Sequence, residues 1–400
     1  MRNALLVITL ALGVVALTTL SRAQLATGTV TTQGNSYTCP LVNSMGQPTG
    51  WIDGTTCQDA TVTNCSADDI NFTFGYEPPI QGTYAGTILF FSSAGGESPG
   101  DDDLQPTTFG PYYLHKGYEI VQIAWKGGPW ESTDGATGTN ILAAACRPAT
   151  FISWAYSNPL LFQGTAKNKA GYCAQGASAG SAQIAYSLAW YGSGSYLDKV
   201  ELLSGPVLSD LEQGCEVDQN GNGAPPLTVC PTTEAACHLG GIQPWSITPE
   251  YIDGYAQGPR AWTGDSSCAG HMPTSQTEDT AWFNQSIDAL VPGNSVNNLA
   301  NTDITAWICA SVYSGTGSMN NSSSQGQLFY SFIGQGSNGP LDIFPVTNCF
   351  DSEGVTGNNS QVPAEGNQNG LTAIEGDMIS GSAAYGFRTS VSCTLNPGHS

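Results

Sequence analysis

The sequence contains few charged residues, and very few of them are positive. Only 10% of the 400 residues are Asp, Glu, Lys or Arg, against about a quarter in an average soluble domain. Acids outnumber bases 32 to 10, which gives a formal net charge of −22 at pH 7. A chain without a basic stripe cannot neutralise phosphates, which argues against nucleic acid or an anionic membrane as its partner.

Long hydrophobic runs are also lacking, apart from one at the N-terminus. Arg2 supplies a short positive segment, residues 4–17 are almost wholly apolar, and Ser21-Arg22-Ala23 has small residues where a signal peptidase reads. This pattern predicts a signal peptide over residues 1–23. An uncleaved anchor is the alternative, although the run is short for a membrane span. We therefore expect a secreted or periplasmic protein with no membrane contact after cleavage.

The cysteines lack the C-x-x-C spacing that is typical of zinc sites. All twelve follow the predicted cleavage site, and an even number in an exported chain predicts up to six disulfides. Asp218, Asn220 and Asn222 match the first half of a calcium-binding loop, but Val229 stands where such a loop has Glu. We expect no cofactor and no catalytic metal, with a structural calcium near Asp218 as the alternative.

Strand and helix patterns alternate along much of the chain. Alternating or continuous apolar runs predict strands over residues 60–64, 70–76, 87–91, 119–125, 170–175, 200–203, 304–312 and 341–347. Helical patterns end near His115 and cover residues 140–156, 179–191 and about 326–333. This order predicts an α/β fold with a mostly parallel central sheet and helices on both faces.

Two segments depart from that alternation. Residues 24–56 are rich in Gly and Thr and are predicted to form an irregular N-terminal arm. Residues 211–300 hold four cysteines and several prolines, which predicts a disulfide-stapled insertion that lies over the sheet as a lid. Residues 57–400 are therefore predicted to be one domain that carries this lid.

One pentapeptide, Gly176-Ala177-Ser178-Ala179-Gly180, lies between a predicted strand and a predicted helix. This is the context of a nucleophile elbow, where a strained turn lifts a serine hydroxyl off the sheet edge. A side chain at Gly176 or Gly180 is expected to collide with the neighbouring strand or helix. An ordinary glycine-rich turn is the alternative, since the chain has 49 glycines.

A second short motif, Ser93-Ala94-Gly95-Gly96, directly follows the third predicted strand. With both motifs, the chain resembles the secreted serine esterases and lipases of the α/β-hydrolase superfamily, and no closer subfamily is assigned. The resemblance implies that Ser178 is the nucleophile and that backbone amides of Ala179 and Gly95 bind the oxyanion. It also implies the chain order Ser, acid, His. Only His399 follows the last predicted strand, which makes it the candidate base, and Asp210 is the candidate acid.

The expected positions of acid and base depart from the superfamily pattern. The loop after residues 304–312 carries no carboxylate, and Asp351 and Glu353 stand where a histidine is usual. Two functions therefore stay open. The first is a serine hydrolase that cleaves carboxylic esters of small molecules or glycans. The second is a catalytically inactive hydrolase-fold protein that binds a ligand such as a neutral glycan. The substrate and the oligomeric state stay open as well.

Overall fold

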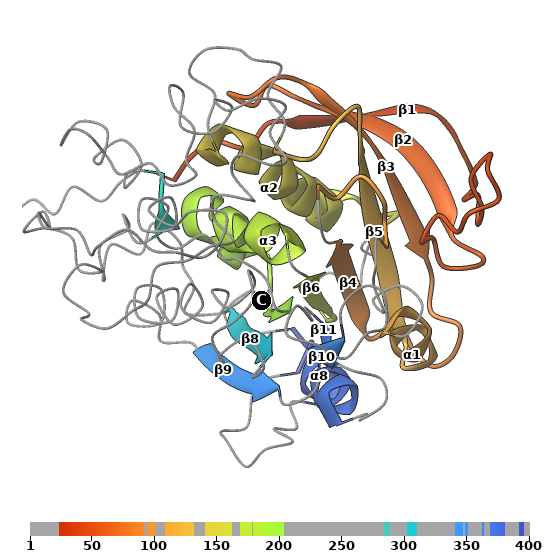
Figure 1. Cartoon of the computed structure of the whole chain (residues 1–400), viewed down its shortest axis with the longest axis vertical. Helices are drawn as coiled ribbons and strands as arrows, with labels where there is room; N and C mark the ends of the chain where they lie inside the picture. The colour runs from red at the N-terminus through yellow and green to blue at the C-terminus, as the bar shows by residue number, and fades with distance from the viewer. Residues whose placement is uncertain are drawn as a thin grey trace, which may run out of the picture.

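Nine strands form one sheet, in the order β1-β2-β3-β5-β4-β6-β7-β8-β9 (Figure 1). They come from a computed structural model that describes residues 24–92, 95–100, 109–131, 141–161, 169–177, 179–203, 285–287, 302–309, 341–346, 349–350, 362–363, 369–380 and 392–395. The strands are β1 (Thr29–Thr38), β2 (Thr56–Thr63), β3 (Ile70–Glu77), β4 (Gly86–Phe91), β5 (Tyr118–Lys126), β6 (Gly171–Ala177), β7 (Lys199–Leu203), β8 (Asp303–Cys309) and β9 (Leu341–Val346). A separate two-stranded sheet pairs β10 (Cys349–Phe350) with β11 (Val362–Pro363).

The sheet is parallel from β5 through β9 and antiparallel at its other end. Strands β5, β4, β6, β7, β8 and β9 all pair in parallel. Strands β1, β2 and β3 pair antiparallel with their neighbours. The carboxyl ends of six strands therefore share one edge, which is where α/β sheets place their ligands.

Helices cover both faces of the sheet (Figure 1). Helices α2 (Ile141–Ser157) and α3 (Ala179–Tyr191) share one apolar core with one face. Helices α1 (Gly110–His115) and α8 (Asn369–Ser380) share a second core with the other face. The mostly parallel sheet with helices on both faces, expected from the sequence, is confirmed.

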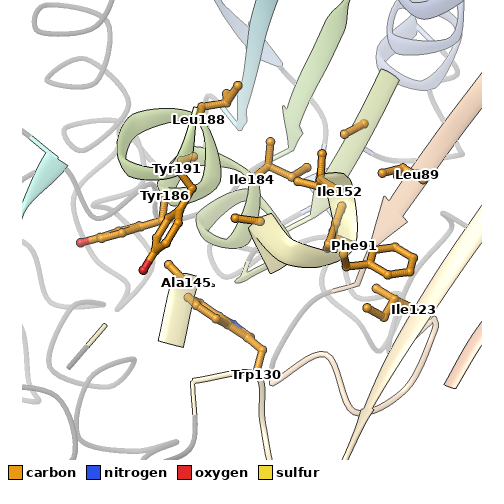
Figure 2. Close-up of a cluster of buried hydrophobic side chains, with 14 of the residues drawn as sticks. Leu89, Phe91, Ile123, Trp130, Ala145, Ile152, Ile184, Tyr186, Leu188 and Tyr191 are labelled. Carbon is orange, nitrogen blue, oxygen red and sulfur yellow. The ribbon is translucent and has the colours of Figure 1, made fainter. Parts of the chain in front are cut away.

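The larger core lies between the sheet and the helices α2 and α3. Figure 2 shows Leu89 and Phe91 of β4 beside Ile152 of α2 and Ile184 of α3. All six residues of β4 and all seven of β6 are buried, because helices cover both of their faces. All thirteen residues of α3 are buried as well, including the polar Ser181, Gln183 and Ser187, so this helix is enclosed on every side.

Among the described residues there are three disulfides, which span 18, 81 and 220 residues of sequence. They are Cys39–Cys57, Cys65–Cys146 and Cys173–Cys393. The last one ties β6 to the segment after α8, and the Tyr118 hydroxyl donates to the carbonyl oxygen of Cys393 at 2.9 Å. The side chains of the other six cysteines lie outside the described residues, so part of the predicted disulfide framework is confirmed.

The segment predicted to be an irregular arm contains a strand. Residues 29–38 form β1, which pairs antiparallel with β2. This edge strand is exposed at nine of its ten positions, so it has no buried face and no apolar alternation that would reveal it. Residues 1–23 and nearly all of the predicted lid, residues 211–300, lie outside the described residues. No helix in the described part of the chain is long and apolar enough to cross a membrane.

Candidate active site

The turn between β6 and α3 is built on two glycines that have no room for a side chain. A Cβ atom on Gly176 would lie 2.5 Å from the carbonyl carbon of Gly180. A Cβ atom on Gly180 would lie 2.1 Å from the carbonyl oxygen of Phe91, the last residue of β4. Real Cβ atoms do not approach backbone this closely, so the expected collision with strand and helix is confirmed. The first turn of α3 therefore lies directly against the carboxyl end of β4.

Ala177 ends β6 and Ala179 begins α3, and both are buried. Ser178 stands between them and lies outside the described residues, as do His399, Asp210 and Asp218. Of the predicted oxyanion residues, both Ala179 and Gly95 are described. His115 is the last residue of α1 and is exposed, which agrees with its expected place at a helix end.

The loop after β4 is held against the end of β5. The carbonyl oxygen of Gly95 accepts a hydrogen bond from the Trp130 amide at 2.9 Å, and that of Gly96 accepts one from the Trp125 amide at 2.8 Å. A Cβ atom on Gly95 would lie 2.3 Å from Cβ of Pro129. The backbone of this loop is therefore fixed by close packing, and its glycines are needed for that packing.

Gln183 of α3 bonds to β5 and lies close to this loop. The indole Nε1 of Trp125 donates to Oε1 of Gln183 at 2.9 Å. An indole N–H is only a donor, so the amide oxygen must face it. The amide nitrogen then faces Gly96, where an added Cβ would lie 3.2 Å away. This buried nitrogen has no hydrogen-bond partner among the described residues. Sequence reasoning missed Gln183, and the available signal was the single amide side chain in a helix that has no charged residue.

Gln122 of β5 connects the N-terminal segment to the far end of the same loop. Its Oε1 accepts from the Ile52 amide at 3.1 Å, and its Nε2 donates to the carbonyl oxygens of Gly50 at 3.0 Å and Pro99 at 3.2 Å. The Ser98 hydroxyl adds a bond to the carbonyl oxygen of Thr49 at 3.1 Å. The segment before β2 therefore supports the loop that carries Gly95.

A buried charge cluster attaches α8 to the sheet. The ammonium of Lys199 in β7 lies 2.8 Å from Oδ2 of Asp377 in α8 and 3.2 Å from Oδ2 of Asp303 in β8. Burial alone would lower the pKa of Lys199, but these two carboxylates outweigh it and raise the pKa. Glu201, two residues along β7, is fully buried, and burial raises its pKa well above the ordinary value. Lys199 already occupies the space between the two aspartates, which gives this cluster a structural role.

Metal ligation has no support in the part of the chain that the structure describes. Within those residues, no group of three or more His, Cys, Asp or Glu side chains is arranged to hold a metal ion. Asp218, the alternative calcium site, lies outside them.

The structure has the arrangement that the resemblance to the α/β-hydrolases implies. Its sheet is mostly parallel and covered on both faces, and at the carboxyl edge a strand leads into a helix within the G-x-S-x-G pentapeptide. No family model matches the sequence, and no curated protein sequence matches it.

Solved structures that match include three esterases. Acetyl xylan esterase 1 from Thermoanaerobacterium sp. is 12% identical, over 80% of this chain and 82% of that chain, with a TM-score of 0.40. A carboxylesterase from Lactobacillus plantarum is 11% identical, over 72% and 82%, with a TM-score of 0.38. Brefeldin A esterase, a bacterial homologue of human hormone sensitive lipase, is 10% identical, over 76% and 71%, with a TM-score of 0.35. Because the identities are 10–12% and the TM-scores are 0.35–0.40, the fold assignment rests on the chain's own strand order.

Proposed function

We propose that the protein is a secreted serine hydrolase that cleaves carboxylic esters through Ser178. The observation that carries this proposal is the pair of glycines at positions 176 and 180, which leave no space for a Cβ atom. Such packing is required when a helix starts directly after a strand at the carboxyl edge of the sheet. An ordinary surface turn does not need its glycines pressed against the backbone of a neighbouring strand.

The proposed reaction is acyl transfer. The Ser178 hydroxyl attacks the ester carbonyl carbon while His399 takes its proton, and Asp210 orients the imidazole. The backbone amides of Ala179 and Gly95 donate to the oxyanion that forms. The C–O bond then breaks, and the alcohol leaves with the proton from His399. Water then attacks the acyl carbon while His399 takes its proton, the bond from the acyl carbon to Ser178 Oγ breaks, and the carboxylic acid leaves as the proton returns to Ser178.

The disulfide at Cys393 supports His399 as the base. Cys393 is bonded to Cys173, which lies five residues before Ser178 in β6. Five strand residues cover about 17 Å. The six residues from Cys393 to His399 cover up to about 20 Å when extended. The tether therefore leaves the imidazole within reach of the turn, although Cys393 lies near the opposite end of β6.

Labelling with a fluorophosphonate, followed by peptide mapping, tests the proposal. We expect one adduct per chain, on Ser178, because only an activated serine reacts. Ser178→Ala is expected to abolish the label and to lower hydrolysis of short-chain esters by at least about a thousandfold. Ser195→Ala, which removes an exposed hydroxyl just after α3, is the control and is expected to change neither.

His399→Ala is expected to lower labelling and hydrolysis together, because it removes the base. A folded protein that gives no adduct, or a Ser178→Ala variant that still hydrolyses esters, would contradict the proposal. The first result would favour the inactive hydrolase-fold binding protein.

A further inference from the structure

A cleft of about 450 Å³ lies on the sheet face that α1 and α8 share, between the N-terminal segment and the loop after β4. Its lining includes Tyr37 of β1, Asn43, Gln47 and Trp51 of the segment before β2, and Glu97 of the loop after β4. Glu97 is two residues from Gly95, so the loop that carries the proposed oxyanion residue also forms one wall of the cleft. Of the residues that the proposed reaction uses, none lines this cleft.

Two aromatic rings are presented in the cleft. Tyr37 is 40% exposed, and Trp51 is partly exposed. The ring of Trp51 packs against Gly75 of β3, where an added Cβ would lie 2.6 Å from one ring carbon and 2.8 Å from another. The glycine therefore provides the space in which this ring lies, and packing holds the ring on that side.

The positive charge in the cleft is already neutralised. Nζ of Lys126 lies 2.7 Å from Oδ1 of Asp59. The same oxygen accepts from the hydroxyls of Thr73 at 2.6 Å and Tyr37 at 3.1 Å. Burial would raise the pKa of Asp59, but the bonds from Lys126 and Thr73 outweigh it and lower the pKa. An anionic ligand consequently finds no uncompensated cation here, and the acidic chain as a whole repels it.

Apart from Ala124 and the carboxylate of Glu97, the remaining lining consists of amide, hydroxyl and proline side chains. The Glu97 carboxylate can accept hydrogen bonds from the hydroxyls of a neutral ligand, and it adds to the repulsion of an anionic one. The Asn43 side chain caps its own loop, because Oδ1 accepts from the amides of Met45 at 2.9 Å and Gln47 at 3.0 Å. The disulfide Cys39–Cys57 closes the segment at its base. Little conformational freedom is therefore lost when a ligand binds.

We propose that this cleft binds a neutral saccharide, and that the saccharide is the sugar part of the ester substrate; the second half of this statement rests on the proposed function. The apolar face of a sugar ring packs on an aromatic ring, and amide and hydroxyl groups bond its hydroxyls without needing charge. The cleft meets the loop of Gly95, so a bound sugar lies next to the place where its ester is cleaved.

Binding of unesterified oligosaccharides tests the proposal without any reaction. The full chain is titrated with xylohexaose, cellohexaose and mannohexaose at millimolar concentrations in a calorimeter. We expect saturable binding of at least one of them. Tyr37→Ala and Trp51→Phe are each expected to weaken that binding about tenfold. Trp154→Phe, a partly exposed tryptophan of α2 on the other face of the sheet, is expected to leave it unchanged.

Either of two results would overturn the proposal. In one, no oligosaccharide binds. In the other, one binds but neither Tyr37→Ala nor Trp51→Phe weakens it. If Trp51→Phe does not fold, Tyr37→Ala decides alone, because Tyr37 lies on an exposed edge strand. A proline-rich peptide is titrated in parallel, since aromatic clefts also bind such segments, and binding of that peptide alone would count against a saccharide. Ser178 labelling succeeds or fails independently of these titrations.

Discussion

Glu119 of β5 is a buried carboxyl that is expected to make the stability of the fold depend on pH. Its side chain is 1% exposed, and burial raises its pKa from 4.5 to about 8, against a smaller opposing effect from the Thr87 hydroxyl. Oγ1 of Thr87 lies 2.7 Å from Oε2 of Glu119 and 3.1 Å from the carbonyl oxygen of Leu161. The Thr87 hydroxyl donates to the carboxyl oxygen of Glu119, which is why it opposes the effect of burial on the pKa.

The magnitude follows from the two pKa values. A group whose pKa is raised by folding stabilises the folded state fully below its unfolded pKa, and that stabilisation is lost as pH rises through the folded pKa. With values of 4.5 and about 8, Glu119 alone lowers the free energy of unfolding by about 2 to 3 kcal/mol between pH 5 and pH 7. Burial raises the pKa of Glu131 to about 8 as well, and Glu201 shifts in the same direction. The wild-type protein is therefore expected to be more stable at pH 5 than at pH 7.

Glu119→Gln isolates this effect, because it keeps the shape and replaces the carboxylic O–H with an amide donor. Urea unfolding is measured at pH 5 and pH 7 for the wild type, Glu119→Gln and the exposed control Asp69→Asn. We expect Glu119→Gln to gain about 2 to 3 kcal/mol on the wild type in going from pH 5 to pH 7, and Asp69→Asn to show no such gain. A difference between Glu119→Gln and the wild type that is the same at both pH values would refute the reasoning.

Two further predictions concern the interior and the tail. Lys199→Met leaves two buried aspartates without their cation, and it is expected to lower the free energy of unfolding in urea by about 3 to 5 kcal/mol. The control Lys126→Met removes an exposed ion pair, with side chains 48% and 38% exposed, and is expected to lower it by at most about 1 kcal/mol. Equal losses for the two variants would be inconsistent with the buried cluster. Replacing Cys173 and Cys393 with serine opens a loop of 220 residues and is expected to cost about 5 kcal/mol by loop entropy, and an unchanged melting temperature would show that this bond does not constrain the chain.

Most of the sheet was predictable because its strands are buried on both faces. The continuous apolar run at residues 87–91 lies within β4, and helix α3 has the predicted bounds, residues 179–191. Strand β1 was missed because an exposed edge strand of Thr, Gln and Tyr carries no apolar period. Helix α8 was missed because its sequence contains two glycines and a buried Asp377 whose cation, Lys199, lies far away in the chain.

The candidate site was predictable only where the pattern is local. Gly176 and Gly180 belong to one pentapeptide and Gly95 directly follows a strand, so local sequence identified them, although Gly180 and Gly95 pack against Phe91 and Pro129 from distant segments. Gln122 and Gln183 act through partners that the fold brings together from distant segments, and no spacing rule reveals them. The disulfide pairs had the same problem, since cysteine positions alone do not fix connectivity.

The bond between Cys173 and Cys393 has a consequence for the order of biosynthesis. The ribosome adds Cys173 to the chain 220 residues before Cys393, the cysteine that bonds to it. The cross-link between β6 and the segment after α8 therefore cannot form before Cys393 has been synthesised, and it needs an oxidising compartment. A chain that stops before residue 393 has every strand of the sheet but lacks the covalent link that holds its tail to β6.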